Sequence, residues 1–259
     1  MLSSSNARLA SARRLTSRKD RRDAGRFLAE GAQAVREAIS AGAVLELFAT
    51  AEAMQRHPEL TADADEISPK DAAALSETVT PQGIVAVCRR IDVTLDEALT
   101  AGPRLVAVLV EPNDPGNAGT ILRTADAMGA DAVVLAGGVD IYNGKAVRAS
   151  AGSLFHLPVV VDVTAGEVLA GMSGAGVQTL ATSGTAERTL DGLVADGSLA
   201  RPTAWLFGSE AHGLSADVID AADEAVRIRI HERAESLNLA AAAAVCLYET
   251  ARAQSGPSR

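Results

Sequence analysis

Three segments in the second half of the chain carry polar residues of the kinds that bind ligands and catalyse reactions. They read NDPGNAGTILRTADAMGA at 113–130, WLFGSEAHGL at 205–214 and ESLNLAAAAAVCLYE at 235–249. Glycine-rich turns allow a backbone to approach a ligand closely, and asparagine, arginine, glutamate and serine side chains can hold or polarise that ligand. The shared combination of a polar turn and an apolar run predicts that the segments act together.

The first segment predicts a turn followed by a helix. Pro115, Gly116 and Asn117 favour the turn, and the Asn117 side chain could cap the helix. Arg123 would lie on the second turn of that helix, where a guanidinium can bind a phosphate through two hydrogen bonds. A capped helix with a surface arginine would have the same residues, so this segment by itself does not establish a phosphate site.

The second segment predicts a loop at the end of a strand. Gly208 and Gly213 suit a loop that lies against a flat ligand. Glu210, between them, could accept a hydrogen bond from a ribose or an amine. We expect His212 to be a loop residue rather than a base, because the sequence provides it with no orienting partner.

The third segment predicts the start of a helix with little side-chain bulk. Ser236 is expected to be the N-cap, with Asn238 just inside the helix. The run AAAAAVCL that follows has high helix propensity and would allow close packing against another backbone.

The elements around these segments predict an α/β fold with a mostly parallel sheet. Continuous apolar runs are typical of strands that are buried on both faces. Such runs alternate with helical patterns, which favours a sheet covered on both sides. The expected strands lie at 105–111, 132–138, 157–162, 177–183, 203–209 and 225–230, and the expected helices at 118–128, 145–153 and 237–253. Ligands bind at the carboxyl ends of parallel strands, so the sheet would bring the segments together.

The first third of the chain predicts a smaller α/β unit and a connector. Helical spacing at 27–42 precedes an expected strand at 44–50 and a helix at 51–57. A short helix is expected within 68–80, where Ser-Pro suits an N-cap and first turn, and a strand at 83–90. Residues 91–104 would connect this unit to the sheet through a short helix.

Charge is distributed unevenly along the chain. The net charge is −9, which argues weakly against a nucleic-acid partner. Residues 8–26 nevertheless contain eight basic and two acidic residues, so this arm carries +6 and the remainder −15. A basic arm can neutralise phosphates locally, whereas a disordered, solubilising tail would have the same composition. The candidate nucleic-acid contacts in the arm are Arg13, Arg14, Arg18, Lys19 and Arg22.

Composition also indicates where the protein works. Cys88 and Cys246 both lie in apolar runs, which favours small core residues over a disulfide or a metal site. The N-terminus lacks the apolar core of a secretory signal, and no long uncharged apolar stretch predicts a membrane helix. We therefore expect a cytoplasmic protein without a metal ion.

Together and in this order, the three segments resemble the motifs of the SpoU/TrmH branch of the SPOUT RNA methyltransferases. The resemblance covers 105–252, including NGKAVRASAGSLFHLPVV at 143–160, and the full pattern is most similar to actinobacterial members named after thiostrepton resistance. GRFLAEGAQAVREAI at 25–39 resembles the family's ribosomal-protein-like substrate-binding domain. The expected parts are a basic arm at 1–25, this N-terminal domain at 26–98 and a SPOUT methyltransferase domain at 104–259.

The resemblance implies methyl transfer from S-adenosylmethionine to a ribose 2′-hydroxyl of RNA, with ribosomal RNA favoured, by a homodimer with a C-terminal trefoil knot. Residues at the family's polar positions are Asn117, Arg123, Glu210, Ser236 and Asn238. Residues at its cofactor positions are Thr182, Gly208, Ile228, Ile230 and Leu237. Arg148 joins the arm as a candidate RNA contact. Arg123 would act as the base or, in a milder role, would hold a phosphate and stabilise the developing alkoxide.

The turn before the third motif departs from the family pattern. Many relatives have a glycine-containing turn before the third motif, where this chain has the bulkier, charged IRIHER at 228–233. Arg229, His231 and Arg233 could therefore contact RNA.

Three other functions are alternatives to ribosomal-RNA methylation. A transfer-RNA ribose methyltransferase and an RNA-binding protein without catalysis are the alternatives within this fold. A nucleotide-binding oxidoreductase is disfavoured, because LVAVLVE is followed by PNDPGNAG and not by G-x-G-x-x-G.

Overall fold

The computed structural model describes residues 1–231, 233–234 and 236–255. Glu232, Glu235 and residues 256–259 lie outside the described residues. The chain forms two compact units. The N-terminal unit comprises Met1–Ile91 and Asp140–His156, and the C-terminal unit comprises Asp92–Val139 and the described chain from Leu157 onward.

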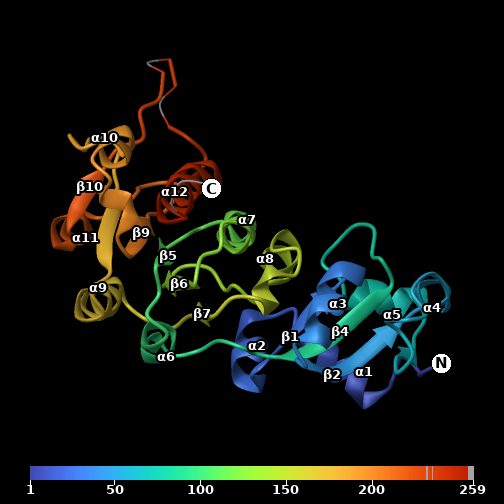
Figure 1. The fold of residues 1–259 in the computed structure, drawn as a ribbon. Helices are drawn as coiled ribbons and strands as arrows, with labels where there is room; N and C mark the ends of the chain where they lie inside the picture. Colours follow the sequence, from blue (N-terminus) through green and yellow to red (C-terminus); the bar gives the residue numbers. More distant parts are fainter. Residues whose placement is uncertain (232, 235, 256–259) are drawn as a thin grey trace. The chain divides into compact units, whose positions relative to one another are not determined.

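The C-terminal unit is built on a six-stranded parallel sheet (Figure 1). Its strand order is β10-β8-β9-β5-β6-β7, and every neighbouring pair is parallel. The strands are β5 (Leu105–Val110), β6 (Ala132–Ala136), β7 (Val159–Val160), β8 (Gln178–Thr182), β9 (Thr203–Phe207) and β10 (Glu224–Val226). The predicted parallel sheet is confirmed, although β10 ends before the isoleucines that the sequence placed in it.

Helices cover both faces of this sheet, as the apolar runs predicted. All six residues of β5 are buried. Val106 and Val108 of β5 pack in one apolar layer with Val168 of α9 (Ala165–Gly174). Trp205 of β9 instead donates its indole hydrogen to the Thr250 hydroxyl of α12 (Leu239–Gln254), at 2.8 Å. The helices of the unit are α6 (Leu95–Thr100), α7 (Pro115–Ala127), α9 (Ala165–Gly174), α10 (Leu190–Ala195), η2 (Ser198–Ala200), α11 (Ala216–Ala221) and α12 (Leu239–Gln254).

The longest of these helices, α12, packs against α7 and against β5 and β9 in the middle of the sheet. The chain therefore returns from the edge strand β10 to the centre of the sheet before it ends. Among the described helices of both units, none combines the length and apolar character that crossing a membrane requires.

The N-terminal unit has a mixed four-stranded sheet in the order β1-β4-β2-β3. The strands are β1 (Arg26–Glu30), β2 (Val44–Ala49), β3 (Asp65–Glu66) and β4 (Ile84–Arg89). Its helices include α3 (Ala32–Ser40), α4 (Ala51–Arg56), α5 (Pro69–Ala74) and α8 (Gly144–Ala149), with the short η1 (Ser153–Phe155). The predicted strands β2 and β4 and the helices α4 and α5 are confirmed.

Two predictions about this unit need correction. The helix expected at 27–42 begins only at α3, because Phe27, Leu28 and Ala29 pair with β4 as a buried strand and Gly31, at φ +91°, separates the strand from the helix. The helix expected at 145–153 is shorter and packs on β1 of the N-terminal unit. The segment Asp140–His156 thus packs with the N-terminal unit.

The basic arm is folded and is not the disordered tail that its composition suggested. It forms α1 (Ala7–Arg14) and α2 (Arg18–Ala24). Leu9 and Leu15 are buried in the core of the N-terminal unit. The buried Arg21 guanidinium donates to the carbonyl oxygens of Leu15, at 2.9 Å, and Thr16, at 2.8 Å, and pairs with Asp140 at 2.8 Å. Two buried leucines and the Arg21 contacts thus hold the basic arm against the N-terminal unit.

A substitution tests this correction. Leu9→Ala should lower the free energy of unfolding by about 2–5 kcal/mol, because it leaves a cavity at a fully buried position. Urea denaturation followed by circular dichroism measures the change, and Ser11→Ala on the exposed side of the same helix is the control. Equal stability of the Leu9→Ala variant and the wild type would show that the arm does not contribute to the core.

Candidate functional site

The three motif segments meet in the C-terminal unit through one chain of hydrogen bonds. The Glu210 carboxylate accepts from the backbone amides of Asn113, at 2.8 Å, and Asp114, at 3.2 Å. It also accepts from the side-chain amide of Asn117, at 2.8 Å. The Asn117 carbonyl oxygen in turn accepts from the side-chain nitrogen of Asn238, at 3.2 Å. The predicted meeting of the segments is therefore present in the structure.

The first segment forms the start of α7, with a different N-cap from the one expected. Asp114 is the N-cap, and its carboxylate accepts from the Gly116 amide at 2.6 Å. Pro115 is the first helical residue, a position that needs no amide hydrogen. Asn117 therefore lies within the first turn, and its side chain is free to join Glu210 and Asn238.

The third segment forms the start of α12, again with a later cap than expected. Asn238 is the N-cap, and its side-chain oxygen accepts from the amides of Ala240, at 2.9 Å, and Ala241, at 3.4 Å. Ser236 is not the cap and lies exposed ahead of the helix. Asn238 thus uses its oxygen for its own helix and its nitrogen for Asn117, which couples the two helix starts.

The second segment folds into a tight hairpin that requires its two glycines. A Cβ atom on Gly208 would lie 2.1 Å from the carbonyl carbon of Gly213, so no other residue fits there without backbone movement. Ser209 and Gly213 exchange backbone hydrogen bonds of 3.1 and 2.8 Å, and Gly213 has φ +68°. The hairpin presents Glu210 toward α7, and His212 lies exposed in the loop, as expected.

A cleft of about 430 Å³ lies where these elements converge. We call it the motif cleft. All five expected cofactor residues line it, namely Thr182, Gly208, Ile228, Ile230 and Leu237. Three of the expected polar residues, Glu210, Ser236 and Asn238, line it as well. Gly213, which the sequence placed in a loop against a flat ligand, lines it too, and the structure adds Ser183, Gly184, Ser209, Val226, Leu239 and Ala242.

The residues that the sequence reasoning missed lie mostly beside residues that it found. Ser183 and Gly184 directly follow β8, so the rule that ligands bind at carboxyl ends of parallel strands could have identified them. Ala242 lies one turn inside α12 and gave no signal of its own, because an alanine in an alanine-rich helix has a general explanation.

The cleft combines apolar and polar walls. Ile230 and Leu237 are 37% and 39% exposed, so they provide an uncovered apolar surface in the cleft wall. The Thr182 hydroxyl donates to the Leu206 carbonyl oxygen at 2.9 Å, so its own oxygen can still accept a hydrogen bond. This combination suits a ligand with both an apolar and a hydrogen-bonding part.

Glu210 is held in its charged form. Partial burial opposes ionisation, but the hydrogen bonds from the Asn117 side chain and the backbone amides outweigh it, so the pKa of Glu210 is lowered from its ordinary value. A carboxylate that already accepts three hydrogen bonds is well suited to fixing the geometry of the site.

Arg123 lies on α7 with Asn117 but does not line the motif cleft. Its side chain is exposed and forms no ion pair within the described residues. The structure therefore places Arg123 where a phosphate could reach it from solvent.

The charged turn at 228–233 contributes to the cleft through its isoleucines. Ile228 and Ile230 line the cleft. Between them, Arg229 points to α10 and pairs with Asp191 at 2.6 Å, with both side chains exposed. The ring Nδ1 of His231 accepts from the Arg233 amide at 3.4 Å. The alternation of apolar and charged residues thus keeps the cleft wall apolar.

The candidate RNA contacts separate into paired and unpaired cations. Arg13 pairs with the buried carboxylate of Asp71, and Arg148 with that of Glu30 at 3.2 Å, so both guanidinium groups are already engaged within the N-terminal unit. Arg14 pairs with Asp20 at 2.6 Å while staying largely exposed. Arg18, Lys19 and Arg22 of α2 are exposed and form no ion pair within the described residues.

Comparisons with known protein families place these features in context. Residues 104–248 match the SpoU rRNA Methylase family, and residues 6–86 match an MRM3-like substrate binding domain. The chain is 34% identical over 256 residues to the 23S rRNA (guanosine(2553)-2′-O)-methyltransferase RlmP of Bacillus subtilis, covering 95% of this chain and 96% of that protein.

Solved structures agree over nearly the whole chain. The SpoU methyltransferase AviRb from Streptomyces viridochromogenes, in complex with the cofactor AdoMet, has a TM-score of 0.85 at 31% identity, covering 98% of this chain and 100% of that one. An AdoMet-bound rRNA methyltransferase from Sinorhizobium meliloti has a TM-score of 0.81 at 28% identity, covering 97% of each chain.

The Glu210 network makes stability depend on pH. Glu210→Gln should lower the free energy of unfolding by about 1 kcal/mol at pH 7, because an amide cannot accept all three hydrogen bonds and Glu210 is partly exposed. Since the folded-state pKa of Glu210 is lowered, its contribution is complete above the ordinary value of 4.5 and is lost as the pH falls through the folded pKa.

Urea denaturation at several pH values measures this difference. Glu187→Gln, at an exposed glutamate of the same unit, is the matched control. A difference between Glu210→Gln and wild type that stays constant below pH 4.5 would contradict the assignment.

Proposed function

Because this chain belongs to the SpoU rRNA methylase family, we propose that it transfers a methyl group from S-adenosylmethionine to a ribose 2′-hydroxyl of ribosomal RNA. The convergence of the three motif segments on the motif cleft is the observation that carries the proposal. Support also comes from relatives named as ribose methyltransferases of 23S rRNA and from related structures bound to AdoMet.

The residues present fit this cofactor. Gly208 and Gly213 line the cleft without side chains, and a Cβ on Gly208 would collide with the Gly213 backbone, so the hairpin presents its backbone to a flat group. Ile228, Ile230 and Leu237 provide apolar contact for an adenine ring, and Thr182 and Ser236 provide hydroxyls for polar groups. The cofactor supplies a methyl group that its sulfonium has already activated.

The remaining tasks of the protein are to align the ribose and to ease the loss of its hydroxyl proton. The coupled starts of α7 and α12 give the site a fixed geometry through Glu210, Asn117 and Asn238. We assign Glu210 and Asn117 to positioning, because their polar atoms are occupied by one another and by the neighbouring amides. Ser236 remains available to contact substrate.

Arg123 is best suited to the milder of its two expected roles. Its side chain is exposed and lies outside the motif cleft, where an RNA phosphate can approach it. The charged guanidinium would hold an RNA phosphate and stabilise the alkoxide as the 2′-hydroxyl proton leaves to solvent.

Ribosomal RNA is favoured over transfer RNA as the substrate. The match of residues 6–86 to a substrate binding domain supports this choice, and so do the names of the relatives. The exposed Arg18, Lys19 and Arg22 would contribute phosphate contacts. A protein that acts on ribosomal RNA would work in the cytoplasm, as the composition suggested.

We also propose the trefoil knot and the homodimer that the family resemblance implies. The return of the chain from β10 at the edge to α12 at the centre of the sheet supports a threaded C-terminus. Val245 and Tyr248 lie on one face of α12 and are 39% and 54% exposed. Side chains of this size in adjacent turns of a helix beside the cleft suit burial against a second copy of the chain.

Arg123→Ala tests the catalytic proposal. The variant should lose methyl transfer by at least about 100-fold, because one charged group that stabilises the transition state is removed. Transfer of a tritiated methyl group into protein-free ribosomal RNA, followed by mapping of the labelled ribose, measures it, and calorimetry should show unchanged S-adenosylmethionine binding. Full activity of the variant would exclude both roles for Arg123, and label on a base would exclude ribose methylation.

Val245→Glu tests the dimer. A buried charge at this interface should shift the protein from dimer to monomer in sedimentation experiments. Val79→Glu, at a fully exposed valine of the N-terminal unit, is the matched control and should remain dimeric. A monomeric wild type, or a dimeric Val245→Glu variant, would exclude this surface as the interface.

A further inference from the structure

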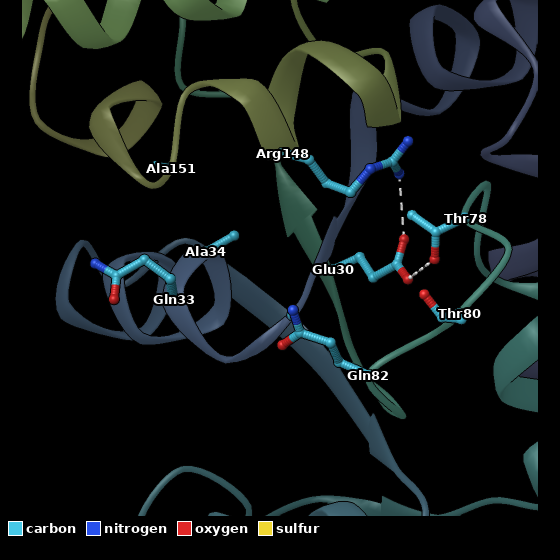
Figure 2. Close-up of a pocket in the computed structure, with 9 residues that line it drawn as sticks. Glu30, Gln33, Ala34, Thr78, Thr80, Gln82, Arg148 and Ala151 are labelled. Carbon is cyan, nitrogen blue, oxygen red and sulfur yellow. Dashed lines mark hydrogen bonds and ion pairs between the residues drawn. The ribbon is translucent and has the colours of Figure 1, made fainter.

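A second cleft lies within the N-terminal unit, at the carboxyl end of β1 (Figure 2). We call it the N-terminal cleft. Its volume is about 200 Å³, which is below the range of about 300–1,000 Å³ for pockets that hold drug-sized ligands. It is lined by Glu30, Gly31, Gln33, Ala34, Thr78, Thr80, Gln82, Arg148 and Ala151.

The polar groups at the base of the cleft form hydrogen bonds and an ion pair with one another. The Glu30 side chain is 7% exposed, and its carboxylate accepts from the hydroxyls of Ser76 and of Thr78, the latter at 3.0 Å. Arg148 pairs with the same carboxylate at 3.2 Å, as Figure 2 shows. The negative charge is therefore balanced, and the base of the cleft is polar without an available net charge.

Gln82 and Ala151 are two further residues that line the cleft. Gln82 lies against Gly31, and its side-chain oxygen accepts from the Ala32 amide at 3.1 Å, at the start of α3. Ala151 adopts φ +50°, a conformation that non-glycine residues rarely take. Such strain persists only where surrounding structure holds it, and it concentrates at functional sites.

Two hydrogen-bonding groups at the cleft remain available to a ligand. The Gln82 side-chain nitrogen and the Thr80 hydroxyl have no hydrogen-bond partner within the part of the chain that the structure describes. Gln82 can donate, and Thr80 can both donate and accept. The small side chains of Ala34 and Ala151 add apolar wall without filling the space.

Charge indicates which unit of the chain meets RNA. The N-terminal unit contains 15 basic and 13 acidic residues, a net charge of +2, whereas the C-terminal unit contains 9 basic and 20 acidic residues, a net charge of −11. RNA binding by the acidic unit on its own would be opposed by repulsion, so the N-terminal unit must supply much of the attraction.

We propose that the N-terminal cleft binds one unpaired nucleobase of the RNA substrate, with Gln82 and Thr80 contacting the polar edge of the base. A neutral, planar group with donors and acceptors matches the neutral Gln82 and Thr80 side chains, whereas the guanidinium that lines the cleft, that of Arg148, is already paired with Glu30 and leaves no unpaired charge for a phosphate. Proteins read RNA sequence mainly through bases that are splayed out of the helix. This inference rests on the proposed function and names the part of the RNA that the N-terminal unit recognises.

Binding of protein-free ribosomal RNA to variants of the full chain tests the proposal. Thr80→Val and Gln82→Ala should each weaken binding about 3- to 10-fold, the effect of one lost neutral hydrogen bond. The KM for RNA should rise by a similar factor with kcat unchanged. Gln55→Ala, at an exposed glutamine of α4, is the matched control. Thr80→Val decides the result if Gln82→Ala, which also loses the bond to Ala32, is unstable.

The salt dependence of binding separates a base from a phosphate. Loss of a base contact leaves the slope of log K against log salt unchanged, whereas loss of a phosphate contact reduces it by about 0.7–0.9. Wild-type affinity in both cleft variants, or a reduced slope, would overturn the proposal. Failure of the proposed function would look different, because the wild type itself would then transfer no methyl group to the RNA.

Discussion

The Glu210 carboxylate is the constraint on which the site depends. Its three hydrogen bonds fasten the hairpin after β9 to the start of α7. Asn117 then passes the connection to Asn238 and the start of α12. Three parts of the chain, separated by up to 121 residues, thereby acquire one geometry. Without this carboxylate, the Asn117–Asn238 hydrogen bond would still connect the two helix starts, but the hairpin after β9 would lose its three hydrogen bonds to the start of α7.

Much of the C-terminal fold could be predicted, because strands buried on both faces leave continuous apolar runs. Less of the N-terminal unit could be predicted from the sequence. Residues 27–30 lead directly into α3 and share its helical spacing, so the sequence predicts a helix there, and only pairing with β4 reveals the strand. Arginines outnumber Leu9 and Leu15 in the basic arm, so composition concealed the two anchors that order it. The placement of Asp140–His156 is a tertiary property that no local pattern encodes.

The sequence predicted most of the residues that form the site, but not the hydrogen bonds that connect them. The resemblance supplied the five expected cofactor residues, and the position of ligands at strand ends explains why they converge. Both helix caps were misplaced, because each motif contains two candidate caps and their spacing does not reveal which oxygen reaches the amides. In the structure, Asp114 caps α7 and Asn238 caps α12. The Asn117 amide is therefore left to form the hydrogen bonds that connect the segments. The N-terminal cleft gave no sequence signal, because its glutamine and threonines are ordinary surface residues.

The most direct measurement of the central claim is a crystal structure of the full chain grown with S-adenosylhomocysteine, the demethylated product of the cofactor. The account predicts electron density for this molecule between Gly208 and Leu237, with the Glu210 carboxylate still bonded to the Asn113 amide and the Asn117 side chain. Density in any other cleft, or a hairpin separated from α7 in the bound state, would contradict it.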